Sequence, residues 1–74
     1  MNQRQLNVLR AIRDYWTDHG FAPSLRDLQL ACDIPSTSSV AYSLTGLRNK
    51  GLIVREGITA RSTRLTKAGE ERAG

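Results

Sequence analysis

Cysteine and histidine are almost missing from this 74-residue sequence, which contains one of each, Cys32 and His19. A single cysteine excludes an internal disulfide, and two such side chains are too few for a zinc site built from Cys and His. We therefore expect a domain without a metal or cofactor. The four aromatic residues are also few, whereas modules that recognise RNA sequences stack unpaired bases on aromatic side chains.

Long apolar runs and catalytic motifs are missing as well. No stretch of 18 or more apolar residues occurs, and the N-terminal MNQRQLNVLR lacks the apolar core of a signal peptide, so we expect a cytoplasmic protein that does not bind a membrane. The sequence contains no Gly-rich phosphate loop and suggests no nucleophile–base or acid–base pair. We therefore expect no enzyme and no small-molecule ligand.

Negative charge is scarce in one segment of the chain. Residues 1–43 contain four arginines and four aspartates, whereas residues 44–67 contain six basic residues and one acidic residue, Glu56. The formal net charge of +4 therefore comes from this segment. Basic charge gathered in one segment is typical of a nucleic-acid-binding face, although a solvated basic surface without a partner would look the same.

Three helices are predicted from apolar spacing and capping residues. The first covers residues 3–19, where apolar residues recur every three or four positions and Trp16 is expected in the core; Gly20 ends it. The second begins after Ser24, which forms a capping box with Asp27, and ends near Asp33. Its Cys32 is expected to be a core residue.

The third predicted helix starts within the run Ser36 to Ser39 and ends at Asn49 or Lys50. Val40, Leu44 and Leu47 define its buried stripe, and the polar residues cluster on the opposite side. These polar residues are Ser38, Tyr42, Thr45 and Asn49. The outer face thus carries hydrogen-bonding groups and no charge, and Gly46 is expected to leave one flank free of bulk.

After Gly51, the β-branched segments LIVRE and RSTRLT predict a two-stranded hairpin with a turn at residues 56–60. The predicted fold is mainly α: a three-helix winged helix-turn-helix with a C-terminal two-stranded β-hairpin wing. We place this domain at residues 1–67 and expect residues 68–74 to be a frayed tail.

Two short helices joined by a tight turn and followed by a basic hairpin form a recurrent DNA-binding arrangement, in which the second helix of the pair enters the major groove. Ser38, Ser39, Tyr42 and Thr45 can hydrogen-bond to base edges, and Ala41 could contact a thymine methyl group. Hydroxyls at the positive end of the helix, including that of Thr37, can meet phosphate oxygens.

The basic residues of the last third of the chain are candidates for contacts with the DNA backbone. On extended strands Arg61 and Arg64 lie on opposite faces, so that one could contact a phosphate or the minor groove while the other packs along the hairpin. Arg48, Lys50 and Arg55 could assist electrostatically, although such residues are often simply solvated.

Three segments carry a family resemblance: GFAPSLRDL (20–28), STSSVAYSL (36–44) and LRNKGLI (47–53). From Arg4 to about Leu65 the sequence resembles the N-terminal DNA-binding domain of LexA repressors. The resemblance implies a winged helix-turn-helix that reads palindromic operators. It also implies a set of base-reading residues and phosphate contacts in the wing. The base readers would be Ser36, Ser38, Ser39, Ala41 and Tyr42, and the phosphate contacts Arg61 and Arg64.

The resemblance has two departures. Asp33 stands where the family usually has glycine, but Asp tolerates the left-handed backbone that such a turn needs. The self-cleaving protease domain of the family, which also supplies most of its dimer contact, is absent from this sequence. We therefore expect a stand-alone regulator or a fragment of a longer protein.

The expected partner is double-stranded DNA, with a palindromic operator and two copies on it as a homodimer, and the expected location is the nucleoid within the cytoplasm. The serious alternative is a protein-interaction module of the same fold. Such a module would use Tyr42, Leu52 and Ile58 as an apolar contact surface.

Overall fold

The computed structural model describes residues 1–55 and 63–74, which form four helices and a two-stranded antiparallel sheet. The helices are α1 (Gln3–His19), α2 (Leu25–Cys32), α3 (Thr37–Asn49) and α4 (Lys67–Ala73), and the strands are β1 (Ile53–Arg55) and β2 (Thr63–Leu65). This confirms the predicted mainly-α winged helix-turn-helix with a β-hairpin wing. A fourth helix, α4, is added to the predicted three.

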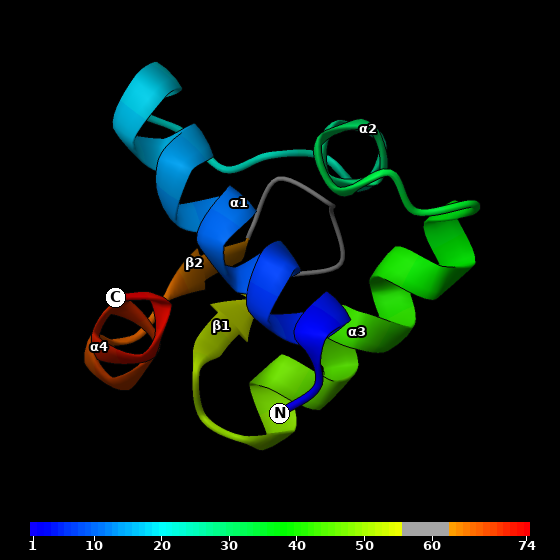
Figure 1. Ribbon diagram of the computed structural model, residues 1–74. Helices are drawn as coiled ribbons and strands as arrows, with labels where there is room; N and C mark the ends of the chain where they lie inside the picture. The colour runs from blue at the N-terminus through cyan, green and yellow to red at the C-terminus, as the bar shows by residue number, and fades with distance from the viewer. Residues whose placement is uncertain (56–62) are drawn as a thin grey trace.

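Helix α1 is the platform of the fold, and the other three helices pack against it. Helices α2 and α3 lie on one side of α1, and the hairpin and α4 lie on the other (Figure 1). Val8, Leu9 and Ile12 of α1 are fully buried, because their spacing puts them on one face of the helix. The other buried hydrophobic residues of the core are Leu28, Ile34, Val40, Leu44, Leu47, Leu52, Ile53 and Ala73.

Side chains satisfy the free backbone N–H groups at the helix starts. Ser24 and Asp27 form the predicted capping box at the start of α2. Asn2 and Gln5 form a second one at the start of α1, which the sequence analysis missed. Helix α1 ends at Gly20, whose φ of 77° is left-handed, as predicted.

The turn between α2 and α3 depends on a left-handed residue that is not glycine. Asp33 ends α2 with a φ of 53°, and its backbone N–H donates a hydrogen bond to the Gln29 carbonyl. Ile34 donates to the same carbonyl at 3.0 Å. Asp33 thus takes the conformation that the sequence analysis expected of it, and it turns the chain into α3.

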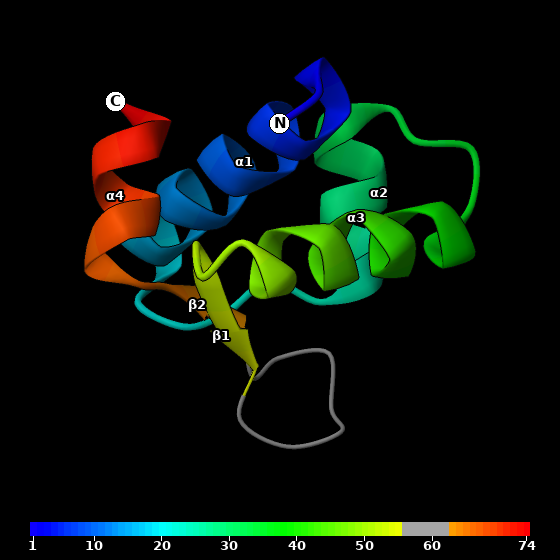
Figure 2. The same ribbon diagram turned by 90° about the horizontal axis from the view of Figure 1, so that it is seen from below.

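The hairpin places its residues alternately toward and away from the core. Ile53 pairs with Leu65, Val54 with Arg64, and Arg55 with Thr63. Ile53 and Thr63 are both 1% exposed, so their side of the hairpin packs on the core. The Val54–Arg64 pair lies on the opposite, exposed side. Figure 2 shows the hairpin leaving from the C-terminal end of α3.

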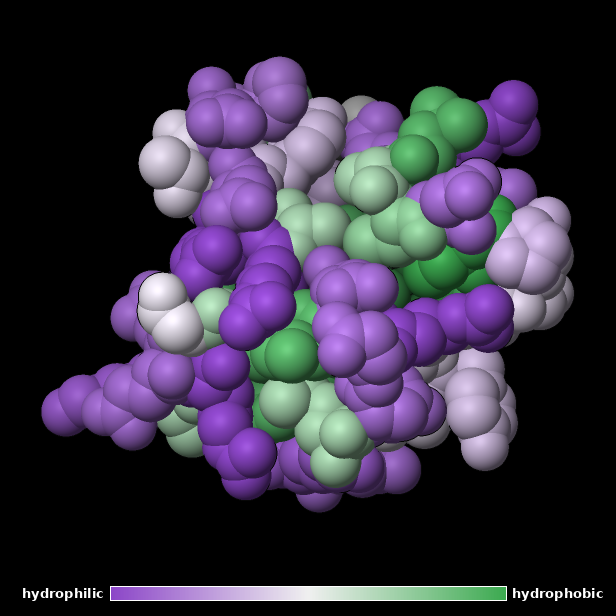
Figure 3. All heavy atoms as spheres, in the orientation of Figure 1, coloured by the Kyte–Doolittle hydropathy of each residue, from purple (hydrophilic) through white to green (hydrophobic). Residues whose placement is uncertain are grey.

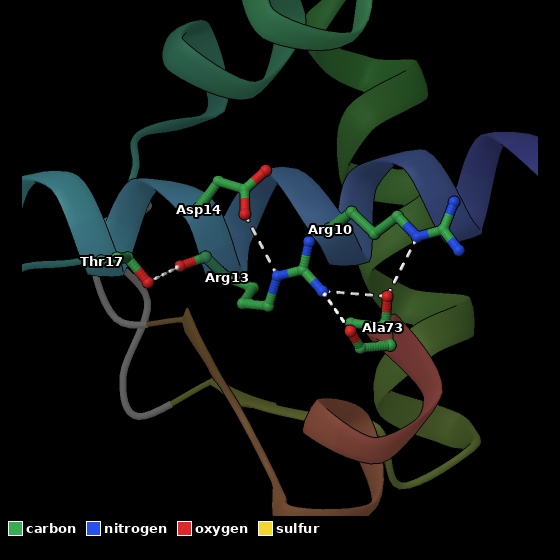
Figure 4. Close-up of polar contacts among 6 residues, drawn as sticks. Arg10, Arg13, Asp14, Thr17 and Ala73 are labelled. Carbon is green, nitrogen blue, oxygen red and sulfur yellow. Dashed lines mark hydrogen bonds and ion pairs between the residues drawn. The ribbon is translucent and has the colours of Figure 1, made fainter.

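The expectation of a frayed tail is wrong, because residues 67–73 form α4. Thr66 caps the helix by accepting a hydrogen bond from the Gly69 N–H at 3.1 Å. At the other end, Ala73 is 2% exposed, and its carbonyl accepts hydrogen bonds from Arg10 (3.0 Å) and Arg13 (2.9 Å) of α1 (Figure 4). A seven-residue helix is unstable alone, so these tertiary contacts stabilise it.

Two residues expected in the core are only partly buried. Trp16 is 36% exposed, and its indole N–H donates a 3.0 Å hydrogen bond to the Thr63 carbonyl. Cys32 packs against the edge of the core, and its Sγ lies 3.6 Å from the Asn7 carbonyl oxygen. The periodicity of α1 located Trp16 on the inner side of the helix but gave no sign of a polar contact there.

We predict that Gly69→Ala destabilises the domain by about 1–3 kcal/mol, because a Cβ at Gly69 would overlap the Leu52 carbonyl group. Urea unfolding followed by circular dichroism would measure the loss. Glu71→Ala truncates a side chain to the same methyl group at an exposed position of α4 and should change stability by less than about 0.5 kcal/mol. Equal stability of the two variants would contradict close packing of α4 on Leu52.

We also predict that Asp33→Gly leaves the domain as stable or stabilises it by up to about 1 kcal/mol, since glycine adopts positive φ without steric strain. Asp33→Val should destabilise it, because a β-branched residue is a poor fit to this conformation. Thermal unfolding of the two variants would test the pair. A glycine variant less stable than the valine variant would contradict the role of the left-handed turn.

Candidate nucleic-acid interface

Helix α3 presents a polar and uncharged face to solvent, as the sequence predicted. Its buried side consists of Val40, Leu44 and Leu47, all 0% exposed. On the other side Tyr42 is 80% exposed, so this ring takes no part in the packing of the core. Ser38, Thr45 and Asn49 are exposed as well, and Ala41 is half-buried.

Ser36 caps the start of α3. Its hydroxyl accepts a hydrogen bond from the Ser39 N–H at 3.2 Å and lies 3.1 Å from the Ser39 hydroxyl. Ser36 and Ser39 are half-buried, whereas Thr37 and Ser38 are exposed and form the solvent-facing start of the helix. The first turn therefore combines accessible hydroxyls with the positive end of the helix dipole, which favours an anion.

Thr45 has part of its hydrogen-bonding capacity in use. Its hydroxyl donates to the Ala41 carbonyl at 3.1 Å, one turn back along α3. The hydroxyl oxygen can still accept, and the methyl group remains available for apolar contact. In this conformation Thr45 could accept a hydrogen bond from a donor group of a partner or pack its methyl group against a methyl group of the partner.

A cleft of about 290 Å³ separates the start of α1 from the first turns of α3. Its lining residues are Asn2, Arg4, Gln5, Ser38, Ser39, Tyr42 and Ser43. The cleft brings the exposed Arg4 beside three of the predicted base readers. Arg4 was not among the predicted site residues, because its charge is balanced by the aspartates of residues 1–43.

Gly46 does not leave a free flank on α3, contrary to expectation. A Cβ at this position would collide with the side-chain amide of Gln5, so the glycine allows α1 and α3 to approach closely. Gln5 is 8% exposed despite its polar side chain. A glycine inside a helix is itself a signal of close packing, and it could have located this contact in the sequence.

The predicted backbone-contacting residues fall into different surroundings. Arg48 and Lys50 are exposed at the C-terminal end of α3. Arg55 is half-buried on the core side of the hairpin, and its Nε has no hydrogen-bond partner among the described residues. Arg64 is exposed and lines a cleft with Trp16 and other residues of α1, β2 and α4. Arg61 lies outside the described residues.

The apolar surface expected of a protein-interaction module is not formed as predicted. Leu52 is 5% exposed and belongs to the core, so that it cannot contact a partner. Ile58 lies outside the described residues, and Tyr42 remains exposed. Residues of high hydropathy instead gather near α2 on the face shown in Figure 3. Leu30 of α2 is 73% exposed.

A further cleft lies between α1 and α2, has a volume of about 490 Å³ and includes Cys32. Burial raises the pKa of the Cys32 thiol, so the thiol is protonated at neutral pH and a poor nucleophile. Within residues 1–55 and 63–74, no helix is both long and apolar enough to cross a bilayer.

Comparison with known proteins agrees with this geometry. The model of the family described as "LexA DNA binding domain" matches residues 1–62. The chain is 40% identical to a LexA repressor of Roseiflexus sp. over 65 residues (88% of this chain and 30% of that protein) and 41% identical to that of Herpetosiphon aurantiacus over 68 (92% and 32%). It is 38% identical over 74 residues to a LexA repressor of Anaeromyxobacter dehalogenans (100% and 32%).

The chain spans about a third of the length of these curated relatives. The matched third is the part that the family model describes as the DNA-binding domain, and it contains α1, α2, α3 and β1. Since the model covers residues 1–62 of 74, the chain belongs to the LexA DNA-binding domain family.

Proposed function

We propose that this protein binds double-stranded DNA in a sequence-specific manner and represses transcription, with α3 in the major groove and the basic hairpin on the DNA backbone. The observation that carries the proposal is the outer face of α3, which is exposed, hydrogen-bonding and uncharged. A helix fits a major groove about 12 Å wide, and uncharged polar groups can read base edges there. Membership of the LexA DNA-binding domain family supports the same function.

Six residues of α3 and its cap are proposed to read bases: Ser36, Ser38, Ser39, Ala41, Tyr42 and Thr45. Ser38 and Tyr42 are the most direct candidates, because they are exposed on the outer face. Ser36 and Ser39 lie close to the helix start, where their hydroxyls already interact with each other. Ser36 caps the helix, and each of the two hydroxyls retains at least one donor or acceptor site for a base.

The proposed contacts with phosphates come from Thr37, Arg48, Lys50, Arg55, Arg61 and Arg64. Arg4 is added to these, because its cleft adjoins the positive end of α3. The guanidinium of Arg4 and the first-turn N–H groups could hold one phosphate together. The half-buried Arg55 would have to turn outward or contact DNA with the outer part of its side chain.

Repression would follow from occupation of an operator by two copies. One domain of this size contacts DNA over about 600–1,000 Å², which gives weak binding, so a palindrome bound by a homodimer would provide the selectivity. The protein would then be found on the nucleoid. Selection of binding sites from a randomised duplex pool tests this directly: an enriched palindrome is expected, and no enrichment would favour the protein-interaction alternative.

The dependence of affinity on salt concentration distinguishes DNA binding from an apolar protein contact. A complex that neutralises about five phosphates should lose affinity with a log–log slope of about −4 to −5. An apolar contact through Tyr42 would be nearly insensitive to salt. The salt slope therefore distinguishes the two functions even before the operator is known.

We predict that Ser39→Glu abolishes operator binding and leaves the fold intact. A Glu three residues after the Ser36 cap forms a capping box, so the helix start is retained, while its carboxylate repels the neighbouring phosphates. Gel shifts and circular dichroism would measure the two effects. Ser39→Gln is the matched control, because it supplies the same cap without charge and should bind more tightly than the Glu variant; equal binding by Ser39→Glu and wild type would remove α3 from its role.

We also predict that Arg61→Ala combined with Arg64→Ala weakens binding to operator and to random duplex by similar factors. Removal of each side chain that neutralises a phosphate should reduce the salt slope by about one. Arg72→Ala, which removes an exposed charge from α4, should leave the slope nearly unchanged. If the double variant no longer discriminated between the two duplexes, the wing would be reading sequence rather than holding the backbone.

A further inference from the structure

The hairpin depends on the rest of the fold for its direction. The described residues form three residue pairs in its sheet, and an isolated two-stranded hairpin is at best marginally stable in water. The hairpin nevertheless carries Arg55 and Arg64, which have to meet the same duplex as α3 if the wing is to assist it. Contacts at the root of the hairpin must therefore fix its angle.

At the end nearest α4, three contacts hold the root. The Thr66 hydroxyl donates to the Gly51 carbonyl at 2.7 Å, and the Thr66 N–H donates to the Leu52 carbonyl at 3.0 Å. Gly69 packs against the same Leu52 backbone. These contacts tie the end of β2 to the turn between α3 and β1.

At the opposite end, a hydrogen bond from Trp16 joins β2 to α1. Its indole N–H donates to the carbonyl of Thr63, the first residue of β2, at 3.0 Å. Thr63 pairs with Arg55, so Trp16 holds the described residue pair that is farthest from α4. The Trp16 ring also lines a cleft of about 290 Å³ with Arg64 and Leu65.

The surroundings of Trp16 favour a role beyond filling the core. More than a third of the residue is exposed, so burial alone is a weak reason for the largest side chain of the chain to stand there. A smaller apolar residue could cover Leu65 but could not hold the Thr63 carbonyl. The indole N–H is thus a polar link between the backbone of β2 and α1, which in turn packs on α3 with Gln5 against Gly46.

We propose that Trp16 is a positioning residue for DNA binding: through its hydrogen bond to the Thr63 carbonyl it fixes the angle between the hairpin and α3, so that both engage one duplex. Trp16 itself makes no contact with DNA. The inference rests on the proposed function and adds a residue of α1, outside both binding elements, that controls how they act together.

Trp16→Phe tests the proposal, because it keeps an aromatic ring and removes only the N–H donor and part of the volume. Amide hydrogen exchange in β1 and β2 should become faster, while exchange in α3 stays unchanged. Affinity for the selected operator should fall by about three- to ten-fold, as expected when one hydrogen bond is removed. The salt slope should decrease by about one, since the wing then holds fewer phosphates.

A double-variant cycle shows whether the effect acts through the hairpin. Combined with Arg64→Gln, Trp16→Phe should weaken binding by less than the product of the two separate factors, because both remove the same wing contacts. Leu25→Ala, at a partly buried position of α2, is the control for general destabilisation. At temperatures where it is fully folded, it should leave the salt slope and the exchange of the hairpin amides unchanged.

Three results would overturn parts of the proposal in different ways. Unchanged hairpin exchange in Trp16→Phe would show that Trp16 does not hold β2. Faster exchange with unchanged affinity and slope would show that it holds β2 without serving DNA binding. If the wild-type protein bound no duplex in a salt-dependent manner, the proposed function itself would fail, and hydrogen exchange would still report whether Trp16 fixes the hairpin.

Discussion

The close approach of α1 and α3 is the constraint on which the other contacts of this fold depend. Val8, Leu9 and Ile12 of α1 are fully buried in the core that α1 shares with α2 and α3, and Gly46 lets the Gln5 side chain lie directly on α3. Because α1 also carries Trp16, Arg10 and Arg13, this helix holds the hairpin and α4 as well as packing on α3. The packing of α1 on the buried side of α3 thus helps to position the elements of the candidate DNA interface.

Most of the helical structure could be predicted from the sequence, since local signals agree with one another there. The apolar period of α1, the Ser24–Asp27 box and the left-handed residues at Gly20 and Asp33 are each a property of a few neighbouring residues. Helix α4 could not be predicted in this way. Six of its seven residues are good helix formers, but a segment this short is marginal by itself, and the contacts that stabilise it come from residues about 60 positions earlier in the chain.

In the candidate site, too, the features that depend on local sequence could be predicted, whereas those that depend on tertiary contacts could not. The outer face of α3 follows from helical periodicity, and the exposure of Ser38, Tyr42 and Thr45 confirms the predicted face. Arg4 was missed, because only the packing of α1 on α3 brings it to that face. The inward side of Arg55 depends on strand register, which alternation alone does not fix in so short a hairpin. The roles of these side chains toward DNA stay predictions.

Helix α4 has a property that is useful in itself. Since residues 67–73 are too few to hold a helical conformation unaided, their helicity depends on their being seated on α1 and Leu52. A spectroscopic probe on an exposed position of this segment would therefore sense the seating as a change in its local mobility. The local mobility of the C-terminal segment would thus report how firmly the root of the hairpin is held by Thr66.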